Sequence, residues 1–251
     1  MNLQRYFIQL SYNGTNYHGW QVQPNASTIQ EVLEKTLSTM LREEIQVTGA
    51  GRTDTGVHAS FFVAHFDSEN SELDNNDFVY KVNSFLPNDI AFQRIWKVPK
   101  DVHARFDAVS RTYKYYISLV KDPFVEETSY KYLYPLDVEK MNEVAKCLFD
   151  YTDFTSFSKL HTDVKTNNCK ILETEWKVEG HQLVFIIKAD RFLRNMVRAI
   201  VGTLLEVGKG KLEVRDVREI IEKKDRGLAG SSAPAHGLFL CGIEYPESLF
   251  K

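Results

Sequence analysis

Cysteine is scarce in this chain of 251 residues, and the spacing of its three cysteines excludes several kinds of site. Cys147, Cys169 and Cys241 are odd in number, far apart and form no CxxC pair. A disulfide framework and a structural zinc site are therefore not expected, and we expect reduced thiols in the cytoplasm. The chain also lacks any other metal-binding or nucleotide-binding motif, so we expect no metal and no cofactor.

Long apolar runs are also missing. No stretch approaches the roughly 18 to 20 apolar residues that a membrane-spanning helix needs, and the N-terminal residues lack the basic-then-apolar pattern of a signal peptide. The apolar fraction of 43% and the charged fraction of 26% are ordinary for a folded protein. The length allows one large domain or two smaller ones, each with its own core. We expect a folded protein that does not enter a membrane.

The net charge of −3 argues weakly against a nucleic-acid partner, but the charges are unevenly placed. Residues 94–121 contain seven basic and two acidic side chains, whereas residues 67–77 contain five acidic side chains and no basic one. Placement matters more than the total, because a basic surface attracts a polyanion whatever the sum of charges. Solvated surface remains the commoner explanation of such runs.

Hydrophobic periodicity predicts a similar order of elements in the two parts of the chain, β-α-β-β-α-β. This order indicates an α+β protein with mainly antiparallel sheets, built from two ferredoxin-like halves at 1–108 and 109–251. The stretch 150–169 is the longest irregular one. The predicted strands are 5–12, 45–48, 61–67, 90–98, 111–120, 170–178, 183–189 and 238–245, and the predicted helices are 28–41, 75–85, 138–149, 192–207 and 214–223.

Asp54 lies in the glycine-rich segment 49–56, between two predicted strands. An isolated aspartate near glycine is most often a structural turn residue. A catalytic interpretation needs partners. In an extended segment Arg52 points to the same side as Asp54, and its guanidinium favours the ionised carboxylate that a nucleophile requires. His58 could bind phosphate or be a buried, hydrogen-bonded core residue, and the sequence slightly favours the core.

Aromatic and basic residues alternate over residues 106–116, where Tyr113 and Tyr115 share one face of a predicted strand. Bases stack on aromatic rings while cations meet phosphates, so this pattern suits RNA. A strand with one aromatic core face explains the segment at least as well.

A third segment, residues 191–202, is strongly apolar yet carries three arginines. Arg191, Arg194 and Arg198 are spaced i, i+3 and i+7, which would align them on the predicted helix. A solvated basic stripe is the simple explanation. Arg198, however, lies among the most apolar residues, where a charge is costly unless it is paired. A carboxylate such as that of Asp54 would satisfy it.

Together these segments resemble the TruA family of tRNA pseudouridine synthases. The resemblance runs over nearly the whole chain and rests on six motifs in the family's order. They are YNGTNYHGWQ at 12–21, GRTDTGVHA at 51–59, LPNDI at 86–90, HARFDA at 103–108 followed by Arg111 and Tyr113, FLRNMVRAIVG at 192–202, and APAHGL at 233–238.

The resemblance implies a role for each matching position. Asp54 would be the catalytic aspartate, Tyr113 would stack on the target uracil and help to move a proton, and Arg198 would pair with Asp54. The remaining candidates for substrate binding are Arg52, His58, Arg111 and Arg194. The fold would be the pseudouridine synthase fold, in which two α/β halves form a central cleft.

The resemblance further implies isomerisation of uridine to pseudouridine at positions 38, 39 and 40 in the anticodon stem-loop of tRNA. It implies a homodimer with RNA lying across both subunits, and no cofactor. One departure concerns residues 157–170, where lysines stand at positions that the family fills with arginines. Lysine can hold a phosphate but lacks the bidentate fork of arginine.

Two other functions compete with this interpretation. The tripeptide Asp54-Thr55-Gly56 is also found in aspartic proteases, which need two aspartates that share a proton. The tripeptide occurs once here, and the predicted helices fit an all-β protease poorly. A non-catalytic tRNA-binding module would explain the basic and aromatic segments but not a pairing of Asp54 with Arg198. Release of tritium from C5 of uridine in tRNA would identify the synthase.

Overall fold

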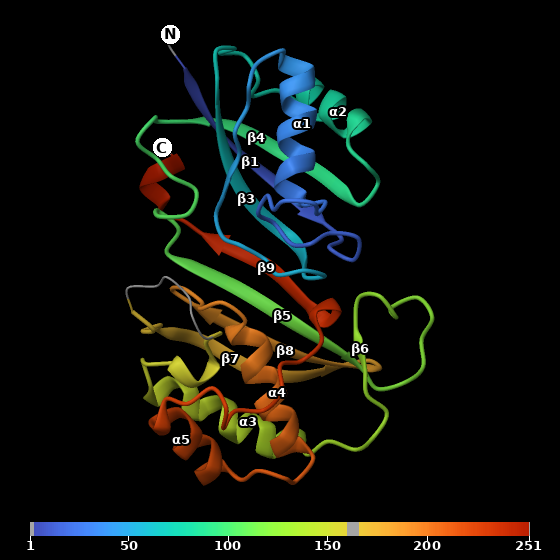
Figure 1. The fold of residues 1–251 in the computed structure, drawn as a ribbon, viewed down its shortest axis with the longest axis vertical. Helices are drawn as coiled ribbons and strands as arrows, with labels where there is room; N and C mark the ends of the chain where they lie inside the picture. Colours follow the sequence, from blue (N-terminus) through green and yellow to red (C-terminus); the bar gives the residue numbers. More distant parts are fainter. Residues whose placement is uncertain (1–2, 160–165, 251) are drawn as a thin grey trace. The chain divides into compact units, whose positions relative to one another are not determined.

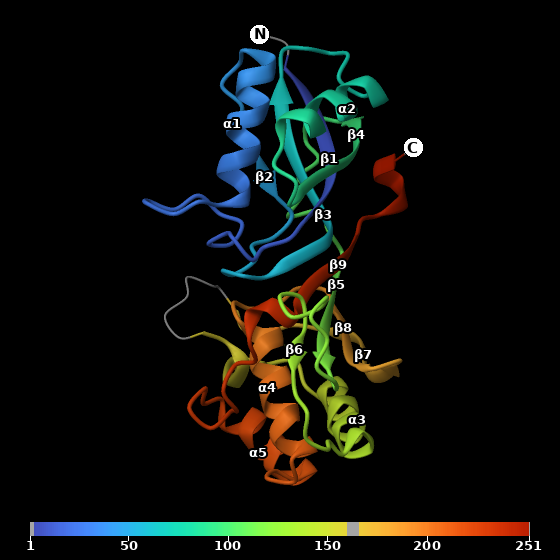
Figure 2. The ribbon, with the colours of Figure 1, turned by 90° about the vertical axis from the view of Figure 1, so that its right-hand side faces the viewer.

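The computed structural model describes residues 3–159 and 166–250, and the chain forms two compact units (Figures 1 and 2). Unit 1 comprises Met1–Val109 and Leu240–Lys251, and unit 2 comprises Ser110–Phe239. The division differs from the expected halves 1–108 and 109–251 at the C-terminus. The last strand, β9 (Leu238–Glu244), starts in unit 2 and ends in unit 1, so the residues after it belong to unit 1.

The strands of unit 1 lie in the order β4-β1-β3-β9 of a sheet in which β1 pairs antiparallel with β4 and β3, and β2 pairs antiparallel with β3. Helices α1 and α2 lie side by side against this sheet (Figure 1). Thr28 caps α1 by accepting a hydrogen bond from Glu31 N (3.3 Å). The elements are β1 (Gln4–Tyr12), α1 (Ile29–Leu41), β2 (Thr48–Gly49), β3 (His58–Ser68), α2 (Asn76–Phe85) and β4 (Ile90–Val98).

The core of unit 1 lies between the helices and the sheet. Alternate residues of β1 point toward the helices, as the period of two in its sequence requires. The fully buried side chains of this core include Tyr6, Ile8 and Leu10 of β1, Ile29, Leu33 and Leu37 of α1, and Phe62 and Phe66 of β3.

The strands of unit 2 lie in the order β5-β8-β7 and pair antiparallel, and a short parallel strand, β6, pairs with β5. Helix α4 is buried on almost all sides, and α3 and α5 pack near it (Figure 2). The elements are β5 (Ser110–Ser118), β6 (Tyr130–Lys131), α3 (Val138–Cys147), β7 (Ile171–Glu179), β8 (Gln182–Ala189), α4 (Met196–Gly208) and α5 (Val214–Lys223).

Three elements differ from the sequence-based prediction. The helix expected at 192–207 begins at Met196, because Asn195 adopts a left-handed conformation (φ 65°), and it ends at Gly208. Arg191 and Arg194 therefore precede the helix, and the expected stripe of three aligned arginines is wrong. The strand expected at 45–48 is reduced to Thr48–Gly49, and β6 was not predicted.

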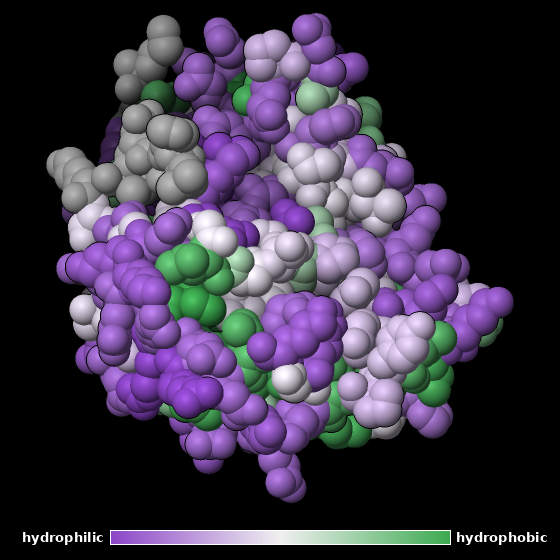
Figure 3. Space-filling view, turned by 60° about the horizontal axis from the view of Figure 1, so that its bottom comes forward, coloured by the Kyte–Doolittle hydropathy of each residue, from purple (hydrophilic) through white to green (hydrophobic). Residues whose placement is uncertain are grey.

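Part of the long irregular stretch falls among the described residues. It forms a short 3₁₀ helix at Thr155–Phe157, while 160–165, with part of the expected lysine-bearing loop, lie outside the described residues. On the helical side of unit 2, Figure 3 shows small apolar groups interspersed with polar ones. In the described part of the chain, no helix combines the length and the hydropathy of a membrane span.

Candidate active site

Asp54 lies half-buried in the loop between β2 and β3, at the start of a tight turn. Its carbonyl accepts a hydrogen bond from Val57 N (3.1 Å), and Gly56 adopts a positive φ of 73°, which a side chain would disfavour. The turn expected around Asp54 is thus present. The residue nevertheless stays partly exposed, so the turn presents the acid rather than burying it.

The opening motif, 12–21, braces this loop. Trp20 N donates to the carbonyl of Thr53 (3.1 Å), and Gly56 N donates to the carbonyl of Tyr17 (3.2 Å). The Tyr12 hydroxyl and Thr53 Oγ1 share a buried hydrogen bond of 2.9 Å. The residues on both sides of Asp54 are therefore fixed, which limits the movement of its carboxylate.

A close backbone approach makes this bracing possible. Gly19 has a φ of 90°, and a Cβ there would collide with the carbonyl oxygen of Thr53, at 2.4 Å. The opening motif is itself held by Asp89. The Asp89 carboxylate accepts a hydrogen bond from Tyr17 Oη (2.6 Å), and the Asp89 carbonyl accepts one from Asn13 N (2.9 Å). Asp89 belongs to the LPNDI motif. Sequence reasoning named these motifs but did not find that their side chains support the Asp54 loop.

His58 begins β3 and is fully buried. Its Nδ1 accepts a hydrogen bond from Gly14 N (3.0 Å). A Cβ on Gly14 would lie 2.0 Å from the carbonyl oxygen of Val57, so the histidine holds the opening motif tightly against the loop. This environment matches the buried, hydrogen-bonded alternative that the sequence slightly favours. Arg52, in contrast, is exposed.

Tyr113 and Arg111 lie on β5 in unit 2, opposite Ile187 and Ala189 of β8. The half-buried ring of Tyr113 meets the ring of Phe192 edge to face, with centroids 5.0 Å apart. Arg111 Nη1 donates to the carbonyl of Asp190 (3.0 Å). The strand thus positions both side chains against the segment that leads into α4.

The aromatic face expected on this strand is split between two roles. Tyr115 is fully buried, its hydroxyl donates to the carbonyl of Pro234 (2.9 Å), and burial raises its pKa. The core interpretation therefore holds for Tyr115. Tyr113 remains partly accessible, as a stacking platform requires.

Arg198 lies half-buried on the first turns of α4. Its Nε donates to the carbonyl of Ala233 (2.7 Å), and Ala233 N donates to the carbonyl of Arg198 (2.9 Å). This two-way contact fixes the plane of the guanidinium through Nε and leaves the two terminal nitrogens for other acceptors. Arg194 lies in the turn before α4, is exposed, and its carbonyl accepts from Lys159 N (3.0 Å).

The segment that holds Arg198 is itself fastened by another arginine. Arg226 donates through Nη1 to the carbonyl of Gly230 (3.2 Å) and through Nη2 to Ser232 Oγ (2.8 Å). Asn195 Nδ2 also lies 2.6 Å from Ser232 Oγ. These contacts join 226–233 to the start of α4, and no sequence pattern indicates them.

The candidate residues thus fall into two groups. Unit 1 carries Arg52, Asp54 and His58 on one short segment, and unit 2 carries Arg111, Tyr113, Arg194 and Arg198 around β5 and the start of α4.

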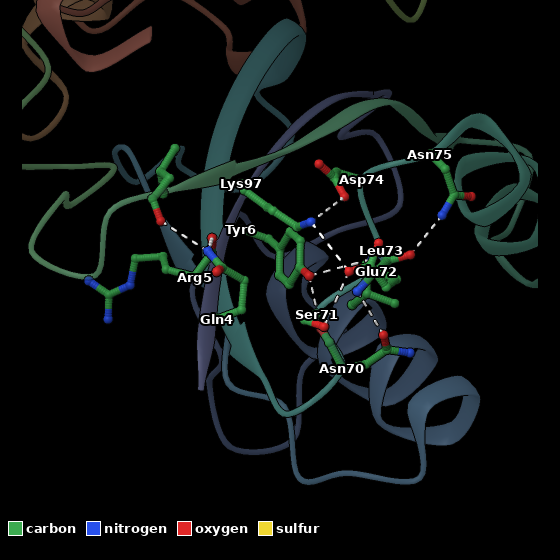
Figure 4. Close-up of polar contacts among 11 residues, drawn as sticks. Gln4, Arg5, Tyr6, Asn70, Ser71, Glu72, Leu73, Asp74, Asn75 and Lys97 are labelled. Atoms are coloured by element: carbon green, nitrogen blue, oxygen red, sulfur yellow. Dashed lines mark hydrogen bonds and ion pairs between the residues drawn. The ribbon is translucent and has the colours of Figure 1, made fainter. Parts of the chain in front are cut away.

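The acidic and basic runs are less separate than the sequence indicates. Lys97, from the basic run, lies 3.2 Å from Asp74 and 3.7 Å from Glu72 of the acidic run (Figure 4). The Tyr6 hydroxyl donates to the carbonyl of Asn70 (2.8 Å) and fastens the acidic segment to β1. Part of the acidic charge is therefore balanced within unit 1.

Comparison with known proteins gives a consistent result. The family model described as tRNA pseudouridine synthase matches residues 9–107 and 145–246. Proteins named tRNA pseudouridine synthase A are 60% identical in Bacteroides fragilis (100% of both chains covered) and 55% identical in Porphyromonas gingivalis (99% of this chain, 100% of that protein). Similarity to a solved dye-decolorizing protein from V. cholerae is too low to inform the fold (TM-score 0.21, 11% identity, covering 97% of this chain and 94% of that one).

Proposed function

Because the chain belongs to the tRNA pseudouridine synthase family, we propose that it is an isomerase that converts uridine to pseudouridine in tRNA. Full-length relatives at 55–60% identity carry this name, and the described site agrees with it. The observation that supports the proposal most strongly is the braced loop of unit 1, which holds Asp54 in place and leaves it partly exposed. Family membership leaves no support for an aspartic protease.

The reaction breaks the bond from uracil N1 to ribose C1′, turns the base and joins its C5 to C1′. C5 loses its proton and N1 gains one, so substrate and product are isomers, and neither an oxidant nor an energy source is consumed. A carboxylate can attack C1′, as in retaining glycoside chemistry, or assist formation of a glycal intermediate. Asp54 is assigned to this step, and both routes remain open.

Tyr113 and Arg198 are assigned to the same centre, as the family resemblance implies. The target base must leave its stack, which costs a few kcal/mol. The partly accessible ring of Tyr113 would receive it and help to move a proton. The terminal nitrogens of Arg198 would pair with Asp54 and hold its carboxylate in position.

The other candidates are assigned by their exposure. Arg52 and Arg194 are exposed, and Arg111 is partly so, so their guanidiniums would bind RNA phosphates. The buried His58 would act through Gly14, by holding the opening motif against the catalytic loop, rather than by touching the RNA.

The finer features of the family are proposed for this chain as well. Each half would be ferredoxin-like, for which the order β4-β1-β3, with β2 paired to β3, in unit 1 and the order β5-β8-β7 in unit 2 give support. The two halves would form a central cleft. The enzyme would be a cytoplasmic homodimer that modifies positions 38, 39 and 40 in the anticodon stem-loop.

Turnover is tested with tRNA that carries tritium at uridine C5. The proposal expects tritium release in step with pseudouridine formation, because C5 loses its hydrogen when it bonds to ribose C1′. Tight tRNA binding without release would instead identify a non-catalytic binding module. A map of pseudouridines in tRNA from cells that lack the protein tests the positions, and loss at 38–40 alone is expected.

A further inference from the structure

A tight turn after β4, residues 102–108, presents an aromatic ring and a cation together. The side chain of Phe106 is 75% exposed. The guanidinium carbon of Arg105 lies 5.8 Å from the centroid of this ring, and the imidazole of His103 packs against it at 4.2 Å. An exposed phenylalanine is ordinary by itself, but this one has a defined orientation.

The turn is held by its own polar groups. His103 N donates to Asp107 Oδ2 (2.6 Å), and Asp107 N donates to the carbonyl of His103 (3.1 Å). His103 Nδ1 accepts from the backbone nitrogens of Arg105 (3.1 Å) and Phe106 (3.4 Å). The backbone beneath the exposed ring is therefore fixed at both ends.

The turn is also fastened to the sheet of unit 1. Ala104 N donates to Nδ1 of the buried His65 (3.1 Å), and the hydroxyl of Tyr245 donates to the carbonyl of Ala104 (2.6 Å). The carbonyl of Val102 accepts from Arg5 Nη1 (3.1 Å). A ring presented by such a turn loses little conformational entropy on binding, which favours its use as a contact.

The cation beside the ring indicates the chemistry of the ligand. The guanidinium of Arg105 contacts the ring of Phe106, and the flanking charges in the sequence are Lys100, Asp101 and Asp107. An aromatic face next to a guanidinium suits single-stranded nucleic acid, since a base stacks on the ring and a phosphate meets the cation.

We propose that the Arg105–Phe106 turn is a second RNA contact, separate from the reacting base, where an unpaired nucleobase of the substrate stacks on Phe106 and a neighbouring phosphate binds Arg105. The proposal rests on the assignment of tRNA as substrate. It gives unit 1 an RNA-binding element outside the Asp54 loop.

Substitution of Phe106 tests the stacking. Removing one base-stacking ring weakens RNA binding by about five- to 150-fold, so the dissociation constant for unmodified tRNA should rise within this range in Phe106→Ala. Phe106→Trp should bind like the wild type, and Phe106→Leu like the alanine variant. The matched control is Tyr80→Ala, an aromatic residue 77% exposed on α2 of the same unit, next to the acidic segment. It should bind tRNA like the wild type.

Salt dependence tests the phosphate contact. In Arg105→Ala the slope of log Kd against log salt concentration should fall by about 1, which is the contribution of one phosphate contact. Phe106→Ala should keep the wild-type slope, because the ring contacts no phosphate. Because both side chains are exposed, melting temperatures should stay unchanged.

Three results would overturn the inference: wild-type affinity in Phe106→Ala, equal weakening in the Ala and Trp variants, or a change in sedimentation mass, which would identify a protein contact. The proposed function is tested separately by tritium release from the wild type. If release is absent but binding still depends on the Phe106 ring, the RNA contact stands and the enzymatic assignment fails.

Discussion

Gly19 controls how closely the opening motif approaches the loop that carries Asp54. In Gly19→Ala the new methyl group would collide with the carbonyl of Thr53, and the positive φ would add about 1 kcal/mol of strain. We expect at least a tenfold loss of tritium release together with a lower melting temperature. The expected loss of activity comes from a displaced Asp54 carboxylate, since a small displacement of a catalytic group can lower the rate about a hundredfold.

Gly180→Ala is the matched control. Gly180 also has a positive φ, of 61°, but no atom lies within 4 Å of the position that its new methyl group would take. This variant should carry the backbone strain and keep its activity. Equal activity in both variants would show that the close approach at Gly19 does not position Asp54.

His58 is expected to be a supporting residue rather than a ligand of RNA. In His58→Ala the buried Gly14 N loses its acceptor, which costs about 1–3 kcal/mol. Urea unfolding should show a loss of this size, and the affinity for tRNA should stay near that of the wild type. Weaker tRNA binding with unchanged stability would contradict this role.

The sequence predicted Asp54 as the catalytic residue through its possible partners Arg198 and Tyr113 and through the family resemblance, whereas the glycines around it indicate only a tight turn. It did not reveal the support from Tyr12 and Tyr17, because hydrogen bonds between residues about 40 positions apart depend on the fold. The sequence could not decide firmly between a buried and an RNA-binding His58 for the same reason, because the contact of His58 with Gly14 joins residues 44 positions apart. Local patterns identify a reactive group, whereas its environment is set by distant segments.

At the scale of elements, the segment 226–233 and the start of α4 act as one support for Arg198. Arg226→Ala removes donors to Gly230 and Ser232, which loosens the chain that leads to the Ala233 carbonyl. We expect kcat for pseudouridine formation to fall by about ten- to a hundredfold, with KM for tRNA nearly unchanged.

Arg215→Ala provides the control, because Arg215 is an exposed arginine of α5 whose side chain is 85% accessible. Both constants should remain at the wild-type value in this variant. A change in KM alone for Arg226→Ala would indicate an RNA contact and contradict a positioning role.

The start of α4 shows why some boundaries could not be predicted. Periodicity extends the helix back to residue 192, but Asn195 takes a left-handed conformation and pairs with Ser232. A contact over 37 residues in sequence thus overrides the local preference. The strong period-two pattern of β1 and the capped start of α1 needed no such help, and both were predicted well.

At the scale of the whole molecule, pH should affect stability through the buried His65. Burial, aided by the charges of Arg5 and His103, lowers the pKa of His65 to about 4 from its ordinary 6.5. The neutral form is therefore favoured in the folded state. The stabilisation that the folded state gains from neutral His65 is fully present above pH 6.5. As the pH falls toward 4, the free energy of unfolding decreases by up to about 3 kcal/mol.

Unfolding by urea between pH 7.5 and 4 measures this loss. Asp67, whose pKa the Arg5 guanidinium holds below its ordinary 3.8, should add a further loss only below that pH. His65→Asn removes the titration while keeping a side-chain acceptor, and its stability should vary less over the same range. An identical pH profile for the variant and the wild type would contradict the assignment to His65.

The central claim is that Asp54, held by a braced loop, carries out the isomerisation. The most direct measurement compares tritium release and tRNA affinity in the wild type, in Asp54→Ala and in Asp77→Ala, a control at an exposed acid on α2. We predict that Asp54→Ala releases no tritium while its affinity for tRNA stays near the wild-type value, and that Asp77→Ala behaves like the wild type. Measurable pseudouridine from purified Asp54→Ala would contradict the account.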